Sequence, residues 1–155
     1  MVKGTTGYTF ANFTFDTSGS GENVKITQLL IKHTTTAPSN FDDLQNITLY
    51  DGTVAQNTPV QGSSETANAG NPTAATTTIT FLTPIVITKN TVKTLTLKAD
   101  ISGSAAAAGH AFGITSTAGV TATGVGTGSS ITPTVTPSDG QTQTVNAAGT
   151  LRYYA

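Results

Sequence analysis

The chain has 155 residues, a formal net charge of −1 and only 10% charged residues, so it has the size of one domain but no broad basic surface for nucleic acid. It contains no cysteine, which excludes disulfides and thiolate metal sites, and no stretch approaches the roughly 20 apolar residues of a membrane span. Roughly a fifth of the residues are threonine, a β-branched residue that favours extended backbone, so we expect strands and few helices.

The first predicted strand, residues 8–15, holds four aromatic residues in two pairs that are out of phase with each other. Because a strand has a side-chain period of two, one residue must be absorbed near Ala11–Asn12, and a β-bulge there would do so. The preceding residues 1–7 are expected to form a flexible lead.

The strongest predicted strand is Val24–Lys32, which has apolar residues on both faces, as a central strand does. A short turn separates it from residues 8–15, which favours a local hairpin between the two strands. The alternative is that residues 8–15 complete a neighbouring molecule by strand addition, because an open edge with four aromatic residues invites pairing with another chain.

Strand and turn signals continue along the rest of the chain. Asn46–Tyr50 is followed by the hairpin signal Asp51–Gly52, and Leu95–Ile101 alternates like a half-buried strand. Between them, residues 56–75 form the longest polar stretch, which we expect to be a long loop that is functional or mobile. Further strands are expected at Thr77–Phe81, Ile85–Ile87, Ala111–Thr115, Val120–Thr123, Ile131–Thr136, Thr142–Val145 and Leu151–Tyr154.

Roughly nine or ten short strands spaced about 8–12 residues apart, without βαβ alternation, predict an all-β fold. We therefore expect a single domain over residues 1–155, an antiparallel two-sheet β-sandwich of the Ig-like kind with long polar loops and little or no helix. The expected core consists of Phe10, either Phe13 or Phe15, Val24, Ile26, Leu30, Ile47, Leu49, Ile79, Phe81, Leu95, Leu97 and Phe112.

The sequence shows no catalytic constellation. There is no G-x-S-x-G nucleophile motif, and the two histidines, His33 and His110, are expected to be ordinary residues at strand ends. The glycine-rich residues 124–130 lack the lysine of a phosphate-binding loop. Glu22 lies in a turn and Glu65 in the long loop, and nothing in the sequence brings these carboxylates together. We therefore expect no enzyme, with neither catalytic nor cofactor-binding residues.

Among possible metal sites, the sequence comes closest to a calcium site, because calcium binds oxygen ligands from loop carboxylates and carbonyls. Asp42, Asp43 and Asp51 flank one short predicted strand at opposite ends, so we expect them not to converge and interpret them as turn-forming residues. No metal-binding residue and no cofactor are predicted.

Three segments carry a resemblance to a known class of protein: FTFDTSGSGENVKITQLLIK (Phe13–Lys32), NITLYDG (Asn46–Gly52) and IVITKNTVKTLTLKADIS (Ile85–Ser102). Together they resemble Ig-like sandwich modules of large prokaryotic cell-surface proteins of the S-layer, adhesin or stalk type, which often occur in tandem. The resemblance covers roughly two thirds of the chain and consists of strands and turns without a diagnostic site. It implies a structural or adhesive role and transfers no functional residue.

Two functions are therefore expected in order of preference. The first is a structural module of a cell-surface, S-layer or extracellular filament assembly, whose partners are copies of itself or tandem domains. The alternative is a binding or adhesion module that recognises a glycan or a host protein through loops such as residues 56–75. The low charge and the Thr/Ser/Gly/Ala-rich composition favour an extracellular location, and no nucleic acid is expected as a partner.

Overall fold

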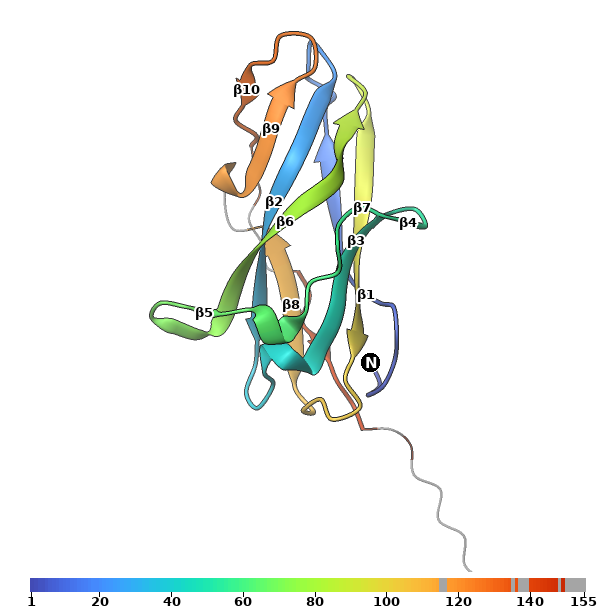
Figure 1. Cartoon of the computed structure of the whole chain (residues 1–155), viewed down its shortest axis with the longest axis vertical. Coiled ribbons are helices and arrows are strands. Elements are labelled where there is room, and N and C mark those ends of the chain that lie inside the picture. The colour runs from blue at the N-terminus through green and yellow to red at the C-terminus, as the bar shows by residue number, and fades with distance from the viewer. Residues whose placement is uncertain (115–116, 135, 137–139, 148, 150–155) are drawn as a thin grey trace, which may run out of the picture.

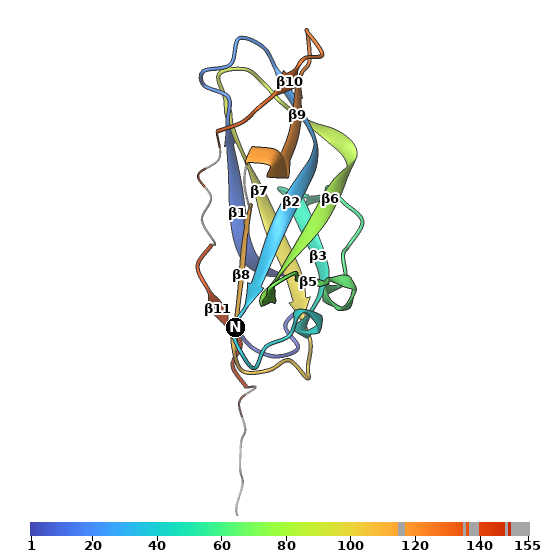
Figure 2. The ribbon, with the colours of Figure 1, turned by 90° about the vertical axis from the view of Figure 1, so that its left-hand side faces the viewer.

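A computed structural model describes residues 1–114, 117–134, 136, 140–147 and 149. It confirms the predicted fold class: in this part of the chain, eleven strands form two antiparallel sheets, and the only helical elements are three 3₁₀ turns of three residues. The two sheets face each other in an elongated molecule (Figures 1 and 2). The 3₁₀ turns are η1 (Phe41–Asp43), η2 (Gly62–Ser64) and η3 (Thr117–Gly119).

The smaller sheet has four strands in the order β1-β7-β3-β4. Their bounds are Tyr8–Asp16 for β1, Val92–Ile101 for β7, Leu44–Asp51 for β3 and Val54–Ala55 for β4. Within the described residues β1 pairs only with β7, in a register that runs from Tyr8 opposite Ala99 to Asp16 opposite Val92. The first strand is therefore an edge strand.

The larger sheet is organised around β2 (Val24–Thr35). One side of β2 pairs with β6 (Asn71–Ile87). On the other side, the first half of β2 pairs with β9 (Val120–Gly124) and its second half with β8 (Gly109–Ile114). Three two-residue strands complete the sheet: β5 (Ala67–Asn68), β10 (Ser130–Ile131) and β11 (Gln143–Thr144).

The core between the sheets contains nearly every residue expected there. One expectation is wrong, because Leu30 is only half-buried whereas Leu29 and Ile31 are 0% and 2% exposed. The cause is a bulge in β2, whose register against β6 and β9 shifts between Ile26 and Gln28. An inserted residue reverses which alternate side chains face the core, so the inward face changes parity within this strand.

The first strand has its predicted bulge but not its predicted partner. The register of β1 shifts between Thr9 and Ala11, one position before the expected site. The hairpin with β2 is wrong: both edges of β2 are taken by β6, β8 and β9, so the turn after β1 carries the chain across to the other sheet. Residues 8–15 pair within their own domain, as an edge strand.

Residues 1–7, expected to form a flexible lead, are hydrogen-bonded to the sandwich. The amino group of Met1 donates to the Thr144 carbonyl at 2.9 Å, and the N–H of Gly4 donates to the Ile101 carbonyl at 3.1 Å. The N-terminus and β11 therefore lie together at the end of the molecule where β1 begins (Figure 2).

The polar stretch 56–75 is also held against the body of the protein. It contains η2, β5 and the start of β6, and Val60 exchanges two backbone hydrogen bonds with Ile47 of β3, at 2.8 and 3.0 Å. At Gly62 the backbone passes so close to the carbonyl oxygens of Phe41 and Leu44 that a Cβ atom would overlap them. This segment is therefore anchored to the sandwich at Asn57, Val60 and Gly62, while most of its residues are exposed.

The strands predicted near the C-terminus are present in part. The expected Ala111–Thr115 and Val120–Thr123 correspond to β8 and β9, and the expected Thr142–Val145 contains β11. In the expected strand Ile131–Thr136, only the first residue is in a strand, β10, among the positions that the structure describes. The expected Leu151–Tyr154 lies outside the described residues.

Candidate functional site

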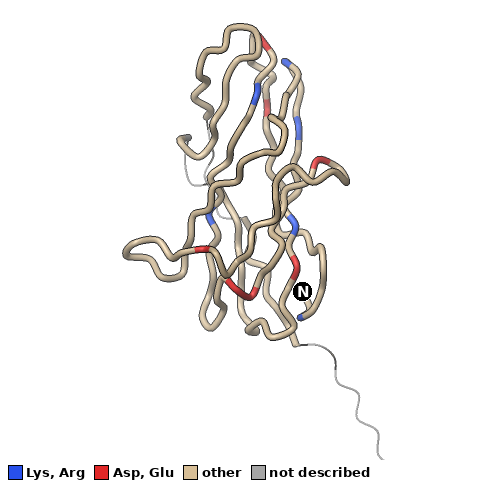
Figure 3. The backbone as a smooth tube through the Cα atoms, in the orientation of Figure 1, with Lys and Arg blue, Asp and Glu red and all other residues tan. Residues whose placement is uncertain are grey.

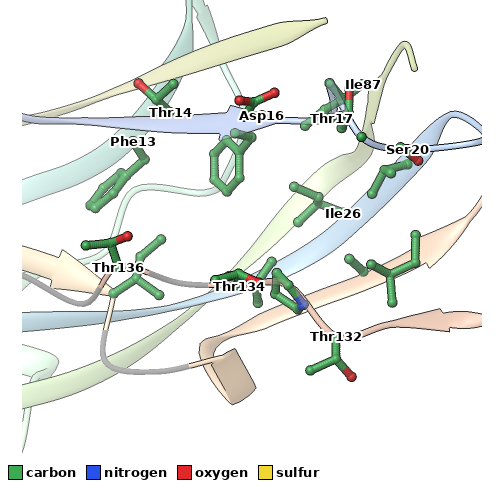
Figure 4. Close-up of a pocket in the computed structure, with 18 of the residues that line it drawn as sticks. Phe13, Thr14, Asp16, Thr17, Ser20, Ile26, Ile87, Thr132, Thr134 and Thr136 are labelled. Carbon is green, nitrogen blue, oxygen red and sulfur yellow. The ribbon is translucent and has the colours of Figure 1, made fainter. Parts of the chain in front are cut away.

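A cleft of about 1390 Å³ lies between the sheets in the half of the sandwich where β1 ends and β2 begins. Figure 4 shows Phe13 of β1 on one side of it, Thr132, Thr134 and Thr136 on the opposite side, and Ile26 of β2 between them. Protein interiors are packed like organic crystals, with few voids larger than a water molecule. A hollow of this size is therefore a part of the sandwich that its own described side chains leave unfilled.

The cleft is lined by apolar side chains together with several threonines, and the charged residues at its rim, the exposed Asp16 and the partly exposed Glu22, are acidic. Apolar side chains come from both sheets, including Phe13, Ile87 of β6 and Phe112 of β8. Its only charged residues among those described are Asp16 and Glu22.

Both rim carboxyls are stabilised as carboxylates. Hydrogen bonds from Ser18 hold the pKa of Asp16 below its usual range. Hydrogen bonds from the hydroxyl and N–H of Thr127, with that of the Gly126 N–H, do the same for the pKa of Glu22. The rim therefore carries negative charge at neutral pH.

Among the described residues, no strand pairs with the edge of β1 beside the cleft. The strands β4, β5, β10 and β11 are each two residues long, whereas β1 has nine residues. Beyond β5, residues 76–87 of β6 form a second long edge without a described strand partner, but of these only Ile87 lines the cleft. Natural edge strands are usually kept short or carry lysine or proline, which prevents pairing with another chain. The sequence of β1, YTFANFTFD, contains neither, and its protective features are its bulge and the charged Asp16 at its end.

The opposite half of the sandwich contains a buried polar network. His33 of β2 and His110 of β8 are both 0% exposed, and their Nε2 and Nδ1 atoms lie 3.0 Å apart. The other ring nitrogen of His33, Nδ1, lies 2.5 Å from Oε2 of Glu65. The second carboxylate oxygen of Glu65, Oε1, accepts a hydrogen bond from the Thr77 hydroxyl at 2.9 Å. At the far end, His110 Nε2 is 3.7 Å from Asp43 Oδ2, beyond hydrogen-bond distance.

The hydrogen-bond directions depend on where the ring hydrogens lie. A Glu65 carboxylate can only accept, so Nδ1 of His33 carries the hydrogen in that bond. In the arrangement in which Nε2 of His33 is an acceptor, His110 donates from Nδ1 and its Nε2 faces a second acceptor, Asp43. That nitrogen is a buried polar atom without a hydrogen-bond partner, so one proton added there would complete the chain of hydrogen bonds.

Aromatic rings enclose this network and keep protonation unfavourable. The ring of His33 stacks on Phe112 at a centroid distance of 4.3 Å and meets Phe41 edge-on at 5.3 Å. Burial, reinforced by the neighbouring His33 and opposed by Asp43, lowers the pKa of His110 to about 4. His110 is therefore neutral at neutral pH. The pair ties β2 to β8, and its burial leaves a substrate no direct access.

A small polar pocket of about 340 Å³ lies at the surface outside Glu65. It is lined by residues of the segment 56–75 and of the turn around η1, including Ser39, Asp42 and Ser63. The hydroxyl of Ser39 is buried and has no hydrogen-bond partner. This pocket is the place where residues 56–75 meet another loop.

The aspartates considered as calcium ligands have separate partners. Asp43 accepts hydrogen bonds from the N–H groups of Asn40 and Ala106, at 3.0 and 3.1 Å. Asp51, at the other end of β3, pairs with Lys93 at 2.6 Å. No group of three or more His, Cys, Asp or Glu residues in the described part of the chain could hold a metal ion.

The buried network was not expected from the sequence. Both histidines lie near strand ends, as predicted: His33 is two residues before the end of β2, and His110 is the second residue of β8. They are not ordinary strand-end residues, because both are fully buried. The alternation of β2 after its bulge places His33 on the same face as Ile31. The sequence contains no comparable signal for Glu65, which reaches His33 only because residues 56–75 fold back onto the larger sheet.

Comparison with known proteins adds no relative: no family model, no curated protein and no solved structure matches the chain. In the described residues no helix is long and apolar enough to cross a membrane. The candidate site must therefore be interpreted from its own geometry.

Proposed function

We propose that the chain is a non-catalytic, Ig-like structural module of a prokaryotic cell-surface, S-layer or extracellular filament assembly. The single observation that carries this proposal is the free nine-residue edge of β1 beside an apolar cleft. An unpaired edge offers N–H and C=O groups to another chain, and apolar surface beside it adds a driving force for association. Neighbouring copies or tandem domains of the same protein are the partners that such an edge suits.

The remaining surface supports a structural role. Charged residues are few and scattered along both sheets, without a patch that would select nucleic acid (Figure 3). The most reactive side chains, His33 and His110, are buried. A sparsely charged, threonine-rich surface of paired strands fits a module that stacks in series outside the cell.

The oligomeric state of the full chain tests this proposal. We expect sedimentation velocity to show assemblies whose fraction rises with protein concentration. Thr14→Lys, which places a charge on the exposed face of the free edge, should abolish assembly without unfolding the domain. The matched control is Val54→Lys on β4, an exposed position on the opposite edge of the same sheet. A monomer at every concentration, or assembly indifferent to Thr14→Lys, would contradict the proposal.

A second candidate, binding of a glycan through the loops, is supported by the polar pocket at Ser39. A sugar hydroxyl would supply the partner that the buried Ser39 hydroxyl lacks. Titration of the full chain with simple hexoses, followed by NMR, should then shift signals around Ser39 and Ser63 and have no effect in Ser39→Ala. Shifts spread evenly over the surface, or equal in the variant, would remove this candidate.

A further inference from the structure

The cleft lies beside β1, where a further strand could pair with it. On one side of it, β1 presents an edge that no described strand pairs with; on the other, Thr132, Thr134 and Thr136 belong to no strand. A lipid chain would fill the apolar space but leave the backbone groups of β1 unpaired. An extended peptide satisfies both requirements, because it pairs with β1 through its backbone and places alternate side chains in the cleft.

We propose that residues 150–155 of a second copy of this chain occupy the cleft and pair with the free edge of β1. This inference rests on the proposed function in self-assembly and names the segment that assembles. Residues 150–155 lie outside the described residues, so their part in the proposal comes from their sequence and from where the described chain leads.

The sequence of this segment, TLRYYA, complements the cleft. In an extended strand, Leu151 and Tyr153 point to one face and Arg152 to the other. The first pair supplies the apolar side chains that a hollow lined by Phe13 requires. Arg152 is the only arginine of the chain and would meet a rim whose only described charges are acidic.

The path of the chain directs this segment to a neighbour rather than to its own cleft. β11 runs away from the cleft, and Asn146 beyond it pairs with Val2 at the end where β1 begins. The side chain of Gln143 accepts a hydrogen bond from the Tyr8 hydroxyl, so these two residues lie side by side. From this point the chain runs three residues away from the cleft to Asn146, whereas the cleft begins three residues in the opposite direction along β1. The return distance is therefore about 20 Å. Five residues, from 146 to 151, span at most about 18 Å. Leu151 therefore cannot enter the cleft of its own chain, and both apolar side chains of the segment fit together only in the cleft of a neighbouring copy.

The resulting assembly is directional. Each copy carries its acceptor cleft in one half and directs its donor segment from the opposite end. Such a contact joins two different surfaces, so it generates open chains of copies unless the rotation between copies closes a ring. A two-fold dimer through paired β1 edges is the rival arrangement, and it makes a different prediction for cross-linking.

Cysteine cross-linking distinguishes these arrangements, because the natural chain contains no cysteine. The full chain is prepared as Thr14→Cys, with the thiol at the free edge of β1, and separately as Tyr154→Cys in the donor segment. The two are mixed and treated with a short bis-maleimide, and cross-linked peptides are identified by mass spectrometry. Val54→Cys, on the exposed β4, replaces Thr14→Cys in the matched control.

We expect a heterodimer that joins positions 14 and 154 and exceeds the position 54 control at least tenfold. The double substitution Leu151→Asp/Tyr153→Asp, added to Tyr154→Cys, should remove it. An equal yield with position 54, an intrachain link in a chain carrying both cysteines, or a link between two copies of Thr14→Cys would each overturn the inference.

Sedimentation velocity on the unmodified chain distinguishes the proposed self-association from the proposed role of residues 150–155 in it. Self-association without the link between positions 14 and 154 would refute the donor segment and leave the structural function standing. A monomer at every concentration would refute both.

Discussion

The two halves of this sandwich share the long strand β2 but are built in opposite ways. Where β2 pairs with β8, the space between the sheets is filled by aromatic rings and a buried network from Glu65 to His110. Where β2 pairs with β9, the space is a cleft bordered by the free edge of β1. Phe112 belongs to both halves, since it stacks on His33 and also lines the cleft.

The difference shows which part of the molecule is complete. In the filled half, aromatic rings and the network occupy the space between the sheets, and residues 56–75 fold back to supply Glu65. Three buried polar atoms of this half, on Thr34, Ser39 and His110, lack a hydrogen-bond partner. The hollow half leaves apolar walls and backbone groups without partners. We propose that the filled half stabilises the domain and that the hollow half is the surface for a partner.

A large effect is expected from breaking the network of the filled half. Glu65→Ala leaves the Nδ1–H of His33 unpaired in the core, and a buried donor that loses its charged partner costs about 3 kcal/mol. Chemical denaturation measures the change in the free energy of unfolding. Glu65→Gln, which keeps an acceptor for His33, should recover part of the loss. Equal midpoints for Glu65→Ala and the parent protein would show that this pair does not stabilise the fold.

Truncating an apolar side chain should lower the free energy of unfolding more in the packed core than in the cleft. Leu97 is 0% exposed, so Leu97→Ala should cost about 2–5 kcal/mol. Ile131 lines the cleft and is only partly buried, so Ile131→Ala should cost less than about 1 kcal/mol in the monomer. Thermal or urea unfolding at low protein concentration provides the comparison. Similar losses for the two variants would mean that the cleft is as well packed as the core.

The buried His110 should make stability depend on pH. Its pKa is lowered to about 4 in the fold from an ordinary value near 6.5, so the unfolded chain binds a proton first as the pH falls. Above about pH 6.5, His110 is neutral in both the folded and the unfolded chain and does not lower the free energy of unfolding. As the pH falls from about 6.5 towards 4, the free energy of unfolding decreases by about 3 kcal/mol in total. His110→Asn retains a donor towards His33 but cannot titrate, so its unfolding free energy should lack this slope. An identical pH profile in the variant would contradict the assignment.

A smaller loss is expected where residues 56–75 pack on η1. In Gly62→Ala the new Cβ meets the carbonyl oxygens of Phe41 and Leu44, and such overpacking typically costs 1–3 kcal/mol. Gly103→Ala is the matched control, because open space surrounds Gly103. If both substitutions leave the unfolding midpoint unchanged, the segment is not held as closely as the structure shows.

The sequence predicted the fold class and most of the core because strand alternation and turn residues are local signals. Leu30 was misplaced because nothing local marks the bulge that reverses the parity of β2. The predicted hairpin of residues 8–15 failed because strand partners are chosen by the whole sheet, where β2 has no free edge. Glu65 and His33 are 32 residues apart, and the cleft is bordered by segments still further apart, so neither region has a sequence signature.

Hydrogen exchange of the β1 amides, measured over a range of protein concentrations, tests most directly whether copies join at the free edge. In the monomer, the β1 amides that do not bond to β7 should exchange rapidly, while those of β7 are protected. As the concentration rises and copies associate, protection should appear along β1 and around the cleft and leave β4 unchanged. Full protection of β1 at the lowest concentration, or an assembled protein in which these amides still exchange freely, would contradict this account.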